Sequence, residues 1–181
     1  SVTHIGEQAF NGCRALREIV LPVGLIELGK EAFSSCNSLT EIIIPDKMIG
    51  LPVTSIGNAA FQNCTNLTSI SIPEGVISIG SSAFYNCDGL TSVEIPNSVT
   101  SIEYRTFDDC DGLTSVTIPN SVTSIGESAF YDCNSLNSIT IGQRVKSIGW
   151  SAFAYTNLNS VTLPSSLELI EEYAFYDCKA L

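Results

Sequence analysis

The chain has 181 residues, 44% of them hydrophobic, which is the length and composition of one folded domain rather than of a disordered segment. It carries 19 Asp and Glu residues against 8 Lys and Arg. The resulting net charge of −11 would repel phosphate backbones and anionic lipid surfaces, so we expect no nucleic-acid partner. No apolar run approaches the ~20 residues that a membrane-spanning helix needs, so we expect no membrane insertion either.

A repeat of about 23 residues organises the whole chain. Successive phenylalanines stand 23 residues apart, except for one interval of 28 and one of 22, at Phe10, Phe33, Phe61, Phe84, Phe107, Phe130, Phe153 and Phe175. A cysteine comes three residues after each phenylalanine, at Cys13, Cys36, Cys64, Cys87, Cys110, Cys133 and Cys178, and Thr156 takes the remaining place. The pattern predicts one solenoid domain over 1–181, with about eight coils and a bulging loop inserted near 46–51.

Each repeat is predicted to begin with a short strand that is buried on one side. In the stretch 113–118, apolar Val116 and Ile118 alternate with polar Ser115 and Thr117, which is the period of a half-buried strand. A proline usually follows and ends the strand, because proline cannot donate a hydrogen bond to a sheet. The strands are predicted, in chain order, at 17–21, 40–44, 68–72, 91–95, 114–118, 137–141 and 159–163.

A second extended stretch and a helical turn complete the predicted repeat. In the fifth full unit they cover 122–125 and 126–133. One or two turns of helix over 126–133 would direct Ala129, Phe130 and Cys133 toward the core. A single coil leaves both faces of its apolar layer open, so neighbouring coils must stack about 4.8 Å apart to close them.

The pattern A-F-x-x-C-x-x-L-x-x-I-x-I-P with V-x-x-I-G resembles the BspA-like class of leucine-rich repeats, found in bacterial surface antigens and in some protist surface proteins. The resemblance extends from Ile5 to Leu181. It implies a curved solenoid with a parallel β-sheet on one face, so with the short helical turns the expected fold is an α/β repeat solenoid. The rule for parallel crossovers predicts that its coil is right-handed. The resemblance also implies an extracellular or cell-surface location, with a signal sequence upstream of this segment, and adhesion to host matrix or plasma proteins or to another cell surface.

The cysteine column has a structural and a chemical interpretation. Parallel side chains in adjacent coils would keep the Cβ atoms about 4.8 Å apart, beyond the ~3.8 Å that a disulfide prefers. A metal site would need clustered ligands, whereas each coil offers one cysteine and His4 is the only histidine. We therefore favour buried, reduced cysteines over disulfides or metal binding, and expect close to all seven thiols to be free. No metal and no cofactor is predicted.

The sequence also predicts no catalytic residue. A serine nucleophile needs a positioned base, and the sole histidine lies near one end of the chain. Glu103, Asp108, Asp109 and Asp111 are close in sequence, but they lack the alternating spacing and the closing Glu of a calcium-binding loop. We interpret them as a solvated acidic edge of a non-enzymatic protein.

Candidate ligand-binding residues fall on two predicted surfaces. The outward side of the strands forms a strip that contains Glu18, Glu41, Ser69, Ser92, Glu94, Ser115, Thr117 and Ser138. Aromatic side chains collect near the predicted helical turns, where Tyr131, Trp150 and Tyr155 are candidate interface anchors. Both surfaces have plain structural explanations, namely β-favouring solvent-facing residues for the strip and packing between neighbouring turns for the aromatics.

The leading functional hypothesis is a non-catalytic, surface-exposed or secreted module that binds a protein ligand in adhesion. The alternatives are a structural spacer and a carbohydrate-binding accessory region of a larger cell-surface protein. We also expect a segment truncated at both ends, because neither end carries a polar capping element. Apolar faces with Ile5 and Phe10 at one end, and Phe175 and Leu181 at the other, would then favour end-to-end stacking.

Overall fold

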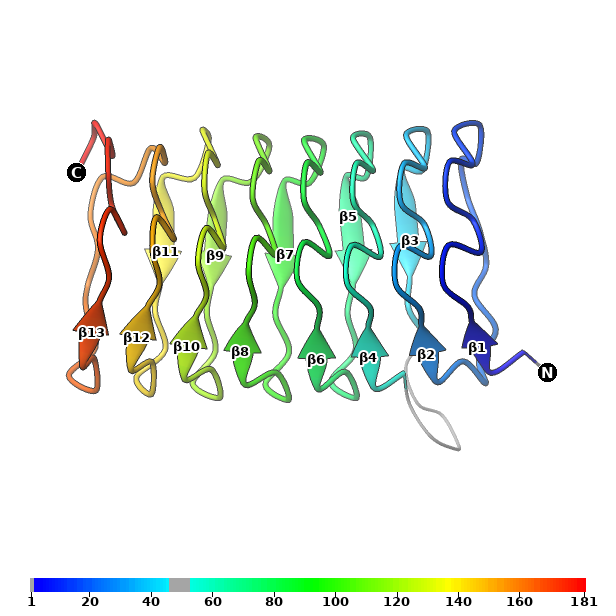
Figure 1. Cartoon of the computed structure of the whole chain (residues 1–181), viewed down its shortest axis with the longest axis horizontal. Coiled ribbons are helices and arrows are strands. Elements are labelled where there is room, and N and C mark those ends of the chain that lie inside the picture. The colour runs from blue at the N-terminus through cyan, green and yellow to red at the C-terminus, as the bar shows by residue number, and fades with distance from the viewer. Residues whose placement is uncertain (1, 46–52) are drawn as a thin grey trace.

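The computed structural model describes residues 2–45 and 53–181, in which short strands stack as one row of coils (Figure 1). The predicted loop near 46–51 lies outside the described residues. The front row of Figure 1 contains β1 (His4–Ile5), β2 (Glu27–Leu28), β4 (Ser55–Ile56), β6 (Ser78–Ile79), β8 (Ser101–Ile102), β10 (Ser124–Ile125), β12 (Ser147–Ile148) and β13 (Leu169–Ile170). The rear row contains β3 (Glu41–Ile43), β5 (Ser69–Ser71), β7 (Ser92–Glu94), β9 (Ser115–Thr117) and β11 (Ser138–Thr140).

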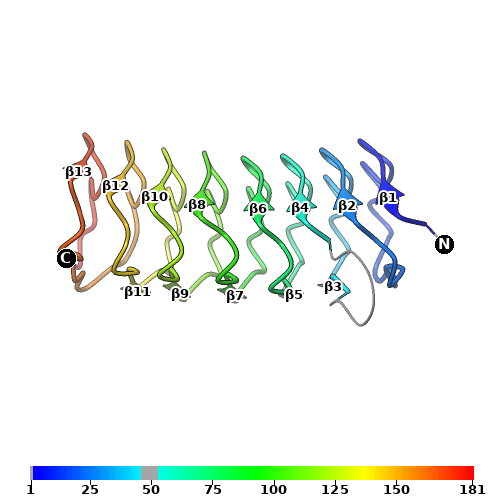
Figure 2. The ribbon, with the colours of Figure 1, turned by 90° about the horizontal axis from the view of Figure 1, so that it is seen from below.

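All the paired strands are parallel and keep the register of the repeat. The front row forms two sheets, β1-β2-β4-β6 and β8-β10-β12-β13, and the rear row forms β3-β5 and β7-β9-β11. In the front row Ser124 of β10 pairs with Ser101 on one side and with Ser147 on the other. Equivalent residues of successive coils therefore lie side by side along the row, which bends only gently (Figure 2).

The predicted strands are confirmed at their centres for 40–44, 68–72, 91–95, 114–118 and 137–141, and the second extended stretch is confirmed as β10. The predictions at 17–21 and 159–163 are wrong, because neither segment forms a strand. Residues 17–21 are joined to the next coil by one described backbone hydrogen bond, from the amide of Thr40 to the carbonyl of Arg17 over 3.3 Å, which does not make a ladder. Residues 159–163 follow the one-residue shortening of the repeat, and the Asn159 amide reaches the Asn137 carbonyl only at 3.4 Å.

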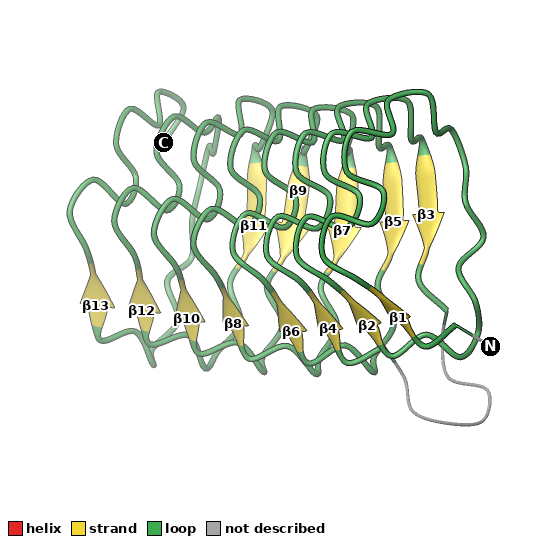
Figure 3. Ribbon diagram, turned by 45° about the vertical axis from the view of Figure 1, so that its right-hand side comes forward, coloured by secondary structure: helices red, strands yellow, loops and turns green. Residues whose placement is uncertain are grey.

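The helical turns are also predicted wrongly, since the described residues contain strands, turns and irregular backbone but no helix (Figure 3). Ser128 and Asp132 both have φ of 54°, a left-handed conformation that interrupts an α-helix. The amides of Ser128, Phe130 and Asp132 donate instead to carbonyls of the next coil, at Trp150, Ala152 and Ala154, over 2.8–2.9 Å. The fold is therefore a parallel β-solenoid rather than an α/β one.

These turn segments recur in every coil and lie between the front strands and the upper edge of Figure 1. We call them together the turn edge, and they cover 7–12, 30–35, 58–63, 81–86, 104–109, 127–132, 150–155 and 172–177. Among the described residues, no helix has the length and apolar character needed to cross a bilayer.

The phenylalanines form one stacked column through the core. The rings of Phe107 and Phe130 are nearly parallel, with centroids 5.3 Å apart, and Phe130 and Phe153 repeat this distance. The six rings from Phe33 to Phe153 are completely buried. Columns of Leu, Ile and Val side chains surround them, so each coil closes the apolar layer of its neighbour.

The cysteines form a second column, in which every thiol from Cys36 onward donates to the phenylalanine carbonyl of the preceding coil. The Sγ atom of Cys64 donates to the carbonyl of Phe33 over 3.1 Å, and Cys133 donates to Phe107 over 3.0 Å. Thr156 occupies the same column but bonds differently, because its hydroxyl donates at 2.9 Å to the carbonyl of Phe153 in its own coil. All seven cysteines are free, and burial raises the pKa of Cys64 to about 12, so its thiol stays protonated at neutral pH.

We predict that thiol reagents will distinguish the cysteines by burial. At pH 7.5 the folded protein should react quickly at exposed Cys13 and more slowly at Cys178, while Cys36, Cys64, Cys87, Cys110 and Cys133 stay protected. Mass spectrometry after timed alkylation measures this order. Unfolding in denaturant without reductant should then release all seven thiols, and recovery of only one or two would contradict the reduced column.

Candidate functional site

An open groove of about 740 Å³ runs across the outward face of the rear strands. In β7 and β9 the exposed, buried, exposed alternation directs Ser92, Glu94, Ser115 and Thr117 outward into this groove. Thr140 of β11 continues the same line one coil further on. Because the strands pair in register, these side chains form two straight polar columns.

The turns after the rear strands form one wall of the groove, which the sequence analysis did not include. Asn97 and Asn120 follow the prolines that end β7 and β9, and Gln143 occupies the next equivalent place. The side chain of Asn97 donates to Glu74 over 3.3 Å, and the backbone amide of Gln143 donates to the Asn120 side chain over 2.7 Å. The recurring Pro-Asn pair was the signal that could have identified this wall.

The predicted strip residues do not all reach the groove. Glu41, Ser69 and Ser138 are exposed on the same rear row but do not line it, although Ser69 borders a smaller recess beside β7. Glu18 is exposed on segment 17–21, which forms no strand. The strip therefore narrows to a polar groove centred on β7 and β9.

The groove offers hydroxyl, carboxylate and amide groups, which are hydrogen-bonding rather than reactive functions. Its lining residues include no histidine, lysine or cysteine that could activate a nucleophile. Across the described residues, no group of three or more His, Cys, Asp or Glu side chains is arranged to hold a metal ion.

The aromatic candidates lie apart from the groove, on the turn edge. Tyr131 and Tyr155 are half-buried and meet edge-to-face with ring centroids 5.3 Å apart, so they pack between neighbouring turns. Trp150 differs because 42% of its surface is exposed. The structure thus separates the sequence-predicted residues into two surfaces and does not bring them together.

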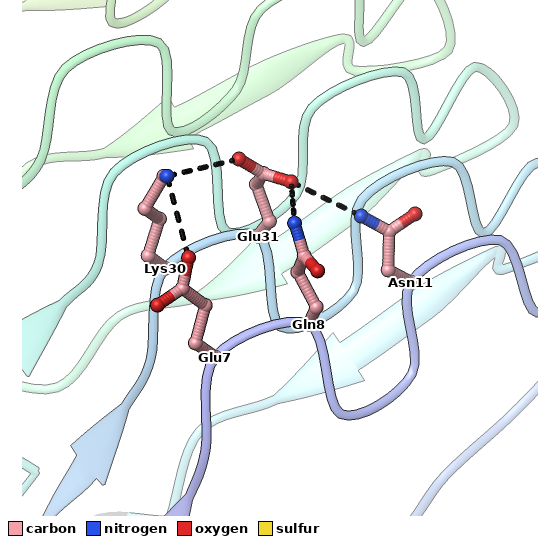
Figure 4. Close-up of polar contacts among 5 residues, drawn as sticks. All are labelled: Glu7, Gln8, Asn11, Lys30 and Glu31. Carbon is pink, nitrogen blue, oxygen red and sulfur yellow. Dashed lines mark hydrogen bonds and ion pairs between the residues drawn. The ribbon is translucent and has the colours of Figure 1, made fainter.

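At the N-terminal end of the turn edge, polar side chains link the first two coils (Figure 4). The Nζ atom of Lys30 lies 3.3 Å from Glu7 and 3.4 Å from Glu31. Glu31 also accepts a 2.7 Å hydrogen bond from Gln8 and a 3.2 Å bond from Asn11. The pKa of Glu31 is lowered, chiefly by the hydrogen bond that Gln8 donates to it. The pKa of Lys30 is raised, chiefly by the hydrogen bond that Lys30 donates to Glu7. Such exposed pairs add little stability, and sequence reasoning missed this network.

The interpretation of a solvated acidic edge is wrong for Asp108, because its side chain is only 3% exposed. Its carboxylate lies 2.8 Å from Nε of Arg105, whose guanidinium carbon stands 5.7 Å from the Tyr85 ring centre and 5.5 Å from that of Tyr104. Burial raises the pKa of Asp108 to about 7, against the lowering effect of Arg105. Asp111 is exposed, as expected.

The comparisons with known proteins agree with the stacked-coil fold described above. The family described as "BspA type Leucine rich repeat region (6 copies)" matches residues 1–52 and 54–181. A leucine-rich repeat protein from Bacteroides ovatus has a TM-score of 0.75 and 27% identity, over 99% of this chain and 57% of that protein. The chain thus spans a little over half of that protein.

Two further bacterial structures are similar. The leucine-rich repeat protein TpLRR of T. pallidum has a TM-score of 0.67 and 27% identity, over 97% of this chain and 72% of that protein. A leucine-rich cell surface protein from Faecalibacterium prausnitzii has a TM-score of 0.51 and 26% identity, over 99% of this chain and 62% of its own. No curated protein sequence matches significantly.

We predict that Asp108→Asn changes the pH dependence of stability. Because the pKa of Asp108 is raised to about 7, the folded protein favours the neutral carboxyl. The neutral carboxyl therefore contributes its full stability below pH ~4, and this contribution is lost as the pH rises through ~7. Asparagine does not titrate. The free energy of unfolding of the variant minus that of the wild type should therefore rise by about 2–4 kcal/mol from pH 4 to pH 8.

Urea unfolding at both pH values measures this difference. Asp111→Asn is the matched control, because it removes an exposed carboxylate from the same turn region and should show little change. A stability difference for Asp108→Asn that is the same at pH 4 and pH 8 would show that the carboxyl ionises freely in the folded protein.

Proposed function

This chain belongs to the BspA-type leucine-rich repeat family, and from that premise we propose that it is a non-catalytic, protein-binding module of a secreted or surface-attached bacterial protein. The similar F. prausnitzii protein, which is described as a leucine-rich cell surface protein, supports the proposed location. Adhesion to a host matrix or plasma protein, or to another cell surface, is the proposed role.

The groove over β7 and β9 is the observation that carries this proposal. Small-molecule sites usually enclose most of their ligand, whereas this groove is open along its length. Its hydroxyl and carboxylate groups project from paired strands, so the backbone that carries them is already ordered before binding. Rigid, open and polar surfaces suit the hydrogen-bonding rim of a protein interface better than a catalytic pocket.

The strip residues enter the proposal in two groups. Ser92, Glu94, Ser115 and Thr117 would make the central contacts because they line the groove. Glu41, Ser69 and Ser138 would extend the contact along the same row. The groove has no aromatic side chain among its lining residues, so nothing in it favours the carbohydrate-binding alternative.

We predict that Thr117→Arg blocks binding to the groove. Thr117 is exposed at the middle of the rear row, and a long side chain there would fill the space above β9. Retention of the protein on immobilised matrix and plasma proteins, measured by surface plasmon resonance, should fall by about tenfold or more.

Ser78→Arg is the matched control. It adds the same side chain at an exposed position of β6, which belongs to the front row, and should bind as the wild type does. Equal unfolding midpoints would confirm that both variants fold. The proposed function would be overturned if the wild type were retained by none of the immobilised proteins, or if Thr117→Arg were retained as strongly as the wild type.

A further inference from the structure

Aromatic and acidic side chains alternate along one column of the turn edge. In successive coils the equivalent position, one residue after the glycine column, is occupied by Tyr104, Glu127, Trp150 and Glu172. Cross-coil hydrogen bonds fix this order, because the Arg105 amide donates to the Glu127 carbonyl over 3.0 Å and the Ser128 amide donates to the Trp150 carbonyl over 2.9 Å. All four side chains are exposed, with 43% of Tyr104 and 42% of Trp150 accessible.

The coil spacing gives this column the dimensions of a cation site. Core rings of the same coils, Phe107, Phe130 and Phe153, are separated by two steps of 5.3 Å. Tyr104 and Trp150 are two coils apart, and Trp150 also meets Tyr173 of the following coil edge-to-face, with ring centroids 5.9 Å apart. At the coil spacing of the core rings, a cation held midway between the coils of Tyr104 and Trp150 would be about as far from each as the ~6 Å over which an aromatic ring attracts it. Glu127 occupies the coil between them and provides the opposite charge.

The neighbouring coil already holds a cation in such surroundings. The guanidinium of Arg105 is shared between the rings of Tyr85 and Tyr104, and its Nε lies 2.8 Å from the carboxylate of Asp108. Tyr85 belongs to the preceding coil and Tyr104 to the coil of Arg105, so this guanidinium joins the two coils that come before the coil of Glu127.

Among the described residues, Glu127 takes part in no ion pair. The ion pairs among residues 2–45 and 53–181 use other carboxylates, those of Glu7, Glu27, Glu31, Asp108, Glu168 and Asp177. A net charge of −11 also favours the approach of a cationic ligand over a neutral or anionic one.

We propose that Tyr104, Glu127 and Trp150 form a recognition site for an arginine or lysine side chain presented by a partner protein. The inference rests on the proposed function and names a chemical feature of the partner. The site is separate from the groove, since it lies on the turn edge rather than on the rear row. Its backbone is fixed by the cross-coil hydrogen bonds, so the cation would enter a prepared position.

Trp150 supplies a direct signal, because it is the only tryptophan of the chain. The isotope-labelled protein is titrated with a Gly-Ser peptide that contains three arginines, and the single indole N–H cross-peak is followed by NMR. Peptides with glutamine or glutamate in place of arginine, and a neutral oligosaccharide, are titrated in parallel. The arginine peptide should shift the peak saturably, and the other three should not.

Two single-charge variants separate local recognition from general attraction. Glu127→Gln should weaken binding of the arginine peptide about three- to tenfold, while Glu27→Gln at an exposed position of β2, with the same charge change, should alter affinity less than about twofold. Tyr104→Leu should weaken binding while keeping an apolar side chain.

Three results would overturn the inference: no indole shift with millimolar arginine peptide, equal weakening by Glu127→Gln and Glu27→Gln, or a shift caused by the oligosaccharide instead. Each would leave the proposed function intact, because that function depends on the Thr117 test in the groove. Conversely, loss of groove binding with a preserved indole response would reject the groove alone.

Discussion

Hydrogen bonds between neighbouring coils are the constraint on which the rest of this structure depends. The strands have two or three residues each, and such short strands have no stability alone. The turns contain left-handed residues such as Ser128 and Asp132, which cost free energy when isolated. Both become stable when neighbouring coils exchange hydrogen bonds. Amides of the turn edge donate to the next coil, whereas amides at the front strands donate to the preceding one, as Gly126 does to the carbonyl of Ile102 over 2.8 Å. The Phe and Cys columns follow, because fixed register places identical side chains above one another.

The same register explains how one core can carry two different surfaces. Apolar positions are committed to the stacked columns, whereas outward positions contact only solvent and the equivalent residues of adjacent coils. On the rear row those positions form the polar groove with Ser115 and Thr117 at its centre. On the turn edge they form the alternating column of Tyr104, Glu127 and Trp150. Both candidate surfaces are thus built from columns of equivalent residues rather than from single loops.

The repeat could be predicted from the sequence because phenylalanine and cysteine recur at fixed spacing, and the parallel rear strands followed from alternation in stretches such as 113–118. The turn conformation could not. A-F-x-x-C spacing suits a turn of helix and two consecutive tight turns equally, and the left-handed positions carry residues as different as Glu31, Ser128 and Tyr155. Burial of Asp108 was also hidden, because it depends on its surroundings in the folded chain rather than on its own unit.

Native-state hydrogen exchange at Ser128 tests the central claim most directly. The Ser128 amide donates to Trp150 of the next coil, whereas in a helix that begins near Gly126 it would be among the first amides, which have no partner. The Phe130 amide is protected in either arrangement. Cross-coil bonding predicts that Ser128 exchanges as slowly as Phe130, at the rate set by global unfolding. Exchange of Ser128 at the rate of an unprotected amide, with Phe130 still protected, would contradict it.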